Sequence, residues 1–121
     1  MPHVDIKFQP GAVEALALAG LLQPVADAVG EFFDEDPDYV SVELVPQNEY
    51  ALNRKTIDIE LNASPDSAGV RERNLVAVSD ALLALTVDFM ERNGVTGDAS
   101  AFCRIFGVGT YSYGAPAATG E

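Results

Sequence analysis

The chain has 121 residues, of which 48% are hydrophobic, and this length and composition favour a single folded domain over residues 1–121. Its formal net charge is −12, so nucleic acids and anionic membranes would repel it, and neither is an expected partner. We attribute the acidity to solubility or a high-salt habitat. Cation binding is the alternative, although no loop has the spacing of a calcium site.

The sequence also limits location, disulfides and metals. No apolar run approaches the roughly 20 residues that span a bilayer, and the alternating N-terminus does not resemble a signal peptide, so we expect a cytoplasmic protein. The single Cys103 excludes an internal disulfide, and one Cys with one His cannot form a zinc site, so we expect no metal and no cofactor. Cys103 falls in a predicted strand, where a buried inert thiol is favoured over a nucleophile, because no second histidine is available as its base.

The first half of the chain predicts a strand, a helix and a strand. Residues 2–8 alternate strictly between apolar and polar side chains, which is the pattern of a half-buried strand. Residues 12–34 have apolar side chains at helical spacing, and Pro24 predicts a kink or break near residues 20–24. Residues 39–45 alternate again and predict a second strand.

The second half predicts the same order. Residues 55–62 alternate as a third strand, and a turn with helix-capping side chains follows at residues 64–67. Residues 70–93 form a long helix with two apolar stripes, which predict burial on more than one side. Residues 101–108 form the last strand of a core that spans residues 2–108. The Gly- and Ala-rich residues 109–121 form an arm or are disordered.

The two halves repeat at a spacing of roughly 53 residues, and each should form a right-handed β-α-β unit with parallel strands. Together they predict an α+β fold with a four-stranded mixed sheet and both helices on one face. The other face is polar; it carries His3, Asp5, Lys7, Ser41, Glu43, Asp58 and Glu60. A sheet with open edges and one uncovered face usually needs a partner, so we expect an oligomer.

Four stretches resemble the tautomerase superfamily, in particular its macrophage migration inhibitory factor and 5-carboxymethyl-2-hydroxymuconate isomerase types. These stretches are Met1–Val4, Tyr39–Pro46, the segment from Thr56 to Ser64 that leads through Arg71 and Arg73 into the helix, and Phe102–Phe106. The resemblance implies homotrimers whose active sites lie where subunits meet. It also implies that the amine of an N-terminal proline, here Pro2 after removal of Met1, acts as general base or acid.

The same resemblance suggests further site residues. Phe102 falls where the inhibitory-factor type has an aromatic ring, Arg104 where it has an asparagine, and Ala63 near a small apolar wall residue. Two family features are missing. The acidic run 34–36 replaces a lysine that precedes the second strand, and the substrate-binding arginine early in that strand is absent. The usual dicarboxylate substrates therefore do not follow from the resemblance.

The expected chemistry is proton transfer in a 2-oxo acid or its enol by a cofactor-independent tautomerase or isomerase. A free α-amino group titrates at about 7.7–8.0, and burial lowers that value toward the working pH of a good base. A cation must steady the enolate, and Arg104 is the candidate, because it shares a strand face with Phe102 and Phe106. Arg54 is a second candidate if it reaches across a subunit interface.

Simpler explanations stand beside these assignments. Proline in second position can serve only the efficient removal of Met1, Arg104 can form a salt bridge in an acidic protein, and His3 can be a solvated or interface histidine. Dehalogenases and a decarboxylase use the same proline in related proteins. The alternatives for the whole chain are a non-catalytic trimer of the same fold that binds a partner or small ligand, and an unrelated ferredoxin-like module. The latter would be dimeric, so the mass of the oligomer separates it from the others.

Overall fold

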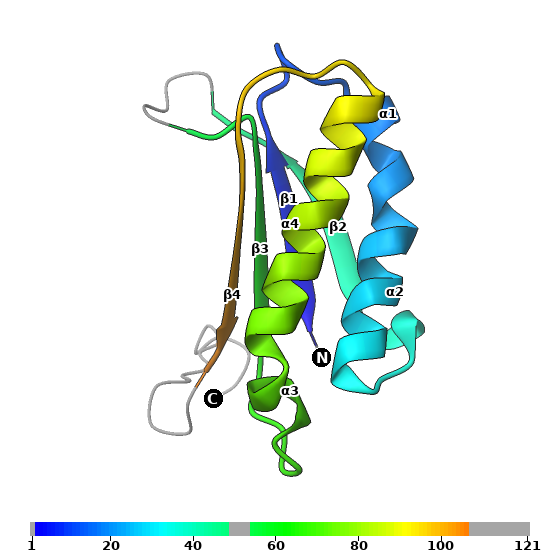
Figure 1. Cartoon of the computed structure of the whole chain (residues 1–121), viewed down its shortest axis with the longest axis vertical. Helices are drawn as coiled ribbons and strands as arrows, with labels where there is room; N and C mark the ends of the chain where they lie inside the picture. Colours follow the sequence, from blue (N-terminus) through cyan, green and yellow to red (C-terminus); the bar gives the residue numbers. More distant parts are fainter. Residues whose placement is uncertain (1, 49–53, 107–121) are drawn as a thin grey trace, which may run out of the picture.

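The computed structural model describes residues 2–48 and 54–106 (Figure 1). Its strands are β1 (His3–Phe8), β2 (Ser41–Pro46), β3 (Ile57–Ala63) and β4 (Ala99–Ile105). Its helices are α1 (Ala15–Leu18), α2 (Leu22–Phe33), α3 (Val70–Arg73) and α4 (Leu75–Arg92), with 3-10 turns at Ala19–Leu21 and Pro37–Tyr39. The predicted C-terminal arm, 109–121, and the end of the predicted last strand lie outside the described residues.

The strands form one mixed sheet in the order β2-β1-β3-β4. β1 is parallel to β2 and β3 is parallel to β4, whereas the two central strands, β1 and β3, are antiparallel. Figure 1 shows that α2 and α4 cover the same face of this sheet. The predicted α+β architecture of two β-α-β units is therefore confirmed.

The alternating strands place their apolar side chains toward the helices. On β1 and β3 every second residue is almost fully buried, whereas the residues between them are partly exposed. These side chains pack against the apolar faces of α2 and α4. The fully buried members include Val4, Ile6, Ile57, Ile59, Leu61, Val25, Val29, Val78 and Leu82. The apolar residues at every second position of the strands and those at helical spacing in the helices thus form the two sides of one core.

The helices differ from the prediction at their starts and breaks. The first begins at Ala15, not at residue 12, and the 3-10 turn Ala19–Leu21 separates it from α2. This break confirms the effect expected of Pro24, which lies in the first turn of α2, where its missing N–H is not needed. The second long helix is interrupted at Asn74, whose side chain donates to the Val70 carbonyl at 2.9 Å.

Two further expectations need correction. By length and composition alone, the segment Ala15–Phe33 is apolar enough to cross a membrane, although no such segment was expected. Its buried residues belong to the core of this fold, and core helices pass the same test, so the segment is weak evidence for a membrane. The second apolar stripe of α4 is buried only at Met90, because its other members, Val76, Leu83 and Val87, are exposed.

Neighbouring leucines on α4 give a direct test of this packing. Leu82 is 0% exposed and Leu83 is 36% exposed. We expect Leu82→Ala to lower the free energy of unfolding by about 2–5 kcal/mol, because it leaves a cavity in a close-packed core. Leu83→Ala is the matched control and should cost less than about 1 kcal/mol. Urea denaturation measures both, and equal losses would contradict the arrangement of α4 on the sheet.

Candidate functional site

Pro2 is buried at the start of β1. Its carbonyl accepts a hydrogen bond from the Ser41 N–H at 3.0 Å, which ties it to the start of β2. In Figure 1 this end of β1 lies at the end of the sheet that also holds α3 and the last turn of α2. β1 is hydrogen-bonded to a neighbouring strand on both sides. The backbone of Pro2, which directly precedes β1, is therefore held in position.

Ala63 lies beside Pro2. The antiparallel register pairs His3 with Asn62, so the next residues along the two strands are Pro2 and Ala63. Ala63 is buried and closes β3. The structure therefore brings together two of the residues selected from the sequence, with Ala63 as an apolar neighbour of the proline.

Arg104 and Phe102 lie on the outer face of the sheet, away from the helices. The Arg104 guanidinium stacks between two rings, 5.4 Å from the centroid of Phe102 and 5.6 Å from that of Phe106. Its Nε donates to Asn62 Oδ1 at 3.1 Å. The expected common face is therefore confirmed. Phe102 is 55% exposed, so much of its ring remains accessible within one chain.

Arg104 and Pro2 are on opposite sides of the sheet within one chain. Pro2 lies two residues before the core residue Val4, so strand alternation places both on the face that the helices cover. Arg104 pairs in register with Asn62, which lies on the outer face. Arg54 is farther away. It precedes β3 at the other end of the sheet, where its carbonyl accepts from Gln9 Nε2 at 3.0 Å, and β1 is about 20 Å long. Neither arginine faces the Pro2 of its own chain.

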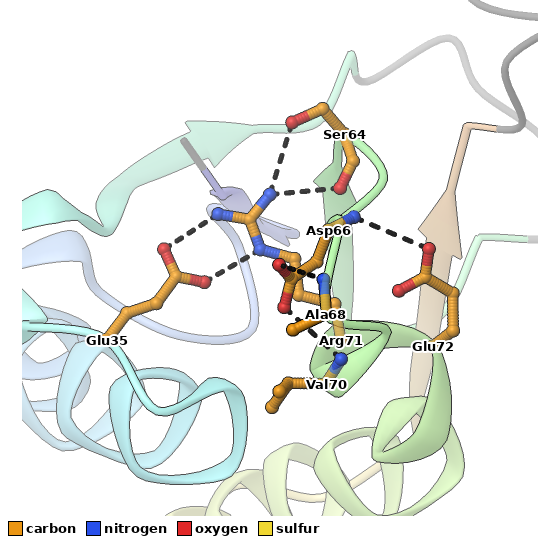
Figure 2. Close-up of polar contacts among 7 residues, drawn as sticks. All are labelled: Glu35, Ser64, Asp66, Ala68, Val70, Arg71 and Glu72. Carbon is orange, nitrogen blue, oxygen red and sulfur yellow. Dashed lines mark hydrogen bonds and ion pairs between the residues drawn. The ribbon is translucent and has the colours of Figure 1, made fainter.

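Arg71, at the start of the second helical region, is a cation at the Pro2 end that was not selected as a site residue. Figure 2 shows it at the centre of a polar network. Its Nε and Nη2 each donate to one carboxylate oxygen of Glu35 at 2.7 Å. Its Nη1 donates to the carbonyl and the hydroxyl of Ser64 at 2.9 and 3.1 Å. Because Ser64 follows Ala63, this network supports the strand end beside Pro2.

The Arg71–Glu35 pair is well shielded from water, with side chains 12% and 20% exposed. The hydrogen bonds with Glu35 raise the pKa of the Arg71 guanidinium despite the opposing effect of burial, and the negative charges of Glu35, Asp66 and Glu72 add to the rise. A raised pKa keeps Arg71 charged over the whole working pH range, so the cation is permanent. Its bidentate contact with Glu35 occupies Nε and Nη2, the donors that would otherwise bind the carboxylate of a ligand.

Asp66 organises the turn that carries Arg71. Its carboxylate accepts the N–H groups of Ala68 and Val70, each at 3.2 Å, as Figure 2 shows. This confirms the helix-capping turn predicted at residues 64–67. The pairing of Arg71 with Glu35 was not predictable from spacing, since the residues are 36 positions apart in sequence. The only sequence signal was the acidic run 34–36 in place of a lysine.

Cys103 is a poor candidate for a nucleophile. It is partly buried on β4 and packs against the core. Burial raises the pKa of its thiol, although a hydrogen bond with Ser79 acts in the opposite direction. A thiol with a raised pKa stays protonated near neutral pH, and the protonated form is the unreactive one.

Comparisons with known proteins identify the fold. No protein-family model matches the sequence, and no curated protein matches it. Among solved structures, a fused 4-OT aligns over 91% of this chain and 94% of its own, with a TM-score of 0.60 and 13% sequence identity. A fused 4-OT described as a symmetric trimer aligns over 92% of this chain and 90% of its own, with a TM-score of 0.56 and 15% identity.

A macrophage migration inhibitory factor-like protein from Entamoeba histolytica aligns as well, over 86% of this chain and 85% of its own, with a TM-score of 0.56 and 12% identity. At these identities the similarity concerns the fold and does not extend to activity. The chain thus shares its four-stranded α+β fold with these fused 4-OT and macrophage migration inhibitory factor-like structures.

Proposed function

We propose that the protein is a cofactor-independent tautomerase in which the Pro2 amine moves a proton in a 2-oxo acid or its enol. The observation that carries this proposal is the position of Pro2, which is buried at the start of a central strand in a fold shared with fused 4-OT. Removal of Met1 would leave a secondary amine there. Ala63 would form an apolar wall beside it, and a low-polarity setting favours the neutral, basic form of an amine.

We further propose that a second copy of the chain completes the site. Within one chain, Arg104 and Phe102 lie on the opposite side of the sheet from Pro2, and Phe102 is largely exposed. The sheet also ends in two unpaired strands, β2 and β4, among the described residues. Such edges are commonly covered by another subunit. A homotrimer would allow Arg104, or Arg54, to approach the Pro2 of a neighbour and steady an enolate.

Replacement of Pro2 tests the proposed base. We expect wild-type protein to catalyse the ketonisation of phenylenolpyruvate, followed by absorbance, and Pro2→Ala to reduce kcat/KM by about 100-fold or more, the usual contribution of a positioned acid–base group. Mass spectrometry of the intact protein should show that Met1 is absent.

The matched control is Pro10→Ala, which changes an exposed proline just after β1. Its rate should equal that of the wild type. Equal rates for wild type and Pro2→Ala would contradict the proposal. The absence of activity in both proteins, with Met1 shown to be removed, would contradict it too.

A non-catalytic protein of the same fold, which binds a partner or small ligand, is the second candidate. The Arg71–Glu35 pair favours it, because the shielded cation nearest the proline end is already bound to a carboxylate. We assign this pair a structural role in either case: it joins the end of α2 to the start of α3 and, through Ser64, to the end of β3.

A double-mutant cycle tests that structural role. Arg71→Ala leaves the Glu35 carboxylate without its partner in a shielded position, so we expect the free energy of unfolding to fall by about 2 kcal/mol. Glu35→Ala should have a similar effect, and the double variant should cost far less than the sum of the two. Chemical denaturation then gives a coupling energy of about 1–3 kcal/mol.

Arg73→Ala serves as the control, because Arg73 is exposed and its Nη1 donates to the carbonyl of Ala68 at 2.9 Å. Its effect should stay below about 1 kcal/mol. If the losses in free energy of unfolding caused by Arg71→Ala and Glu35→Ala add up in the double variant, the pair does not stabilise this end of the fold.

A further inference from the structure

The outer face of the sheet carries a second group of chemically active side chains, unrelated to the proposed role of Pro2. It consists of His3, Asp5 and Glu43, whose potential ligand atoms all lie within 4.8 Å of one another. His3 Nε2 is 2.8 Å from Asp5 Oδ1 and 3.3 Å from Glu43 Oε1. One imidazole nitrogen and two carboxylates therefore lie close together on this face.

The backbone determines this convergence. His3 and Asp5 are two residues apart on β1, so strand alternation places them side by side on the outer face. The parallel register sets Glu43 of β2 directly beside Asp5. Three side chains that a rigid, hydrogen-bonded pair of strands brings together lose less entropy on binding an ion than three on separate loops.

Ser41 orients the imidazole. Its Oγ lies 3.0 Å from His3 Nδ1, and the register places it directly beside His3. Histidine ligands of metals usually have their second ring nitrogen held by such a partner, which fixes the ring and the tautomer. Nε2 lies at hydrogen-bond distance from Asp5 Oδ1, 2.8 Å, so without an ion a proton on Nε2 is shared with that carboxylate. A bound cation would replace this proton, and Ser41 Oγ would then accept the proton carried on Nδ1.

The distances and charges suit a small divalent ion. Zn²⁺ binds nitrogen and oxygen at about 2.0–2.2 Å, which separates neighbouring tetrahedral ligands by roughly 3.3–3.5 Å. The His3–Glu43 distance already lies in this range, and the His3–Asp5 distance needs to widen by about 0.5 Å. The lysine on this face, Lys7, is bound to Glu60 at 3.0 Å and not to a carboxylate of the cluster.

The cluster is also open to solvent. The side chains of Asp5, His3 and Glu43 are 25%, 39% and 60% exposed, so an ion can enter and water can complete its coordination. An imidazole ligand favours Zn²⁺ and related transition metals, whereas Mg²⁺ and Ca²⁺ prefer oxygen ligands alone.

We propose that His3, Asp5 and Glu43 bind one divalent transition-metal ion of the Zn²⁺ class, with Ser41 holding the imidazole. One Cys and one His are too few to bind zinc alone, but carboxylates are zinc ligands as well. The pairing of Glu43 with Asp5 depends on strand register, which residue spacing does not show.

Calorimetric titration of the untagged full chain with ZnCl₂ tests the site. We expect saturable binding of one ion per chain, and at least a 10-fold weaker affinity in His3→Gln and in Glu43→Gln. Ser41→Ala should weaken binding about 10-fold, as loss of a supporting partner usually does. Since His3 is the only histidine in the chain, NMR of its ring nitrogens gives an independent measurement on unaltered protein. Nε2 should shift as zinc is added.

The matched control is Glu91→Gln, which removes one exposed carboxylate from α4 and should leave zinc affinity unchanged. Mg²⁺ should show no saturable binding at the same concentrations. Three outcomes would overturn the proposal: no saturable zinc binding, zinc binding that is unaltered in His3→Gln and Glu43→Gln, or Mg²⁺ binding of equal strength. The last two would indicate diffuse attraction to an acidic surface. None of these results depends on tautomerase activity.

Discussion

β1 lies between β2 and β3, and both of its edges are hydrogen-bonded. The positions of Pro2 and of the cluster around His3 depend on this constraint. Its strict alternation sends Val4, Ile6 and Phe8 into the core and His3, Asp5 and Lys7 to the opposite face. A one-residue slip in register would exchange these two sets, and burial of the charged set would be very unfavourable. The strand therefore has one stable position, and the backbone of Pro2 is fixed with it.

The two faces of the sheet serve different purposes. The inner face is a close-packed apolar layer under α2 and α4. The outer face is a ladder of polar contacts: Lys7 binds Glu60, Ser100 donates to Asp58 at 2.7 Å, and Arg104 donates to Asn62. Carboxylates outnumber cations on this face, as they do in the whole chain. The cluster around His3 is where that excess is most concentrated and has a nitrogen ligand beside it.

Much of the fold could be predicted from the sequence because its signals are local. Alternation in residues 2–8 and 55–62 marked both central strands, and Pro24 marked the break before α2. The repeat of strand, helix and strand gave the parallel pairing of β1 with β2. Helix limits were less accurate: the predicted helix 70–93 is divided at Asn74, whose side chain donates to the Val70 carbonyl, a contact that the spacing of apolar residues does not show.

The candidate site was predicted less completely, because its contacts join distant residues. The sequence selected Pro2, Ala63 and Phe102, but alternation alone could not show that Arg104 lies on the opposite face from Pro2. The Arg71–Glu35 pair and the contact between His3 and Glu43 depend on how separate strands and helices meet. In the sequence, the acidic run 34–36 differs from the superfamily pattern and has no other evident role. The structure shows that Glu35, within this run, forms an ion pair with Arg71.

The measurement that tests the central claim most directly is the titration of the Pro2 nitrogen by NMR, with ¹⁵N-labelled proline. An N-terminal amine differs in chemical shift from the peptide-bonded nitrogens of the other prolines. We predict one proline nitrogen that titrates, with a pKa below the usual value of about 7.7–8.0 for an α-amino group, because burial disfavours its charged form. Two results would contradict the account: no titrating proline nitrogen, which means that Met1 is retained, or a midpoint at or above that usual value.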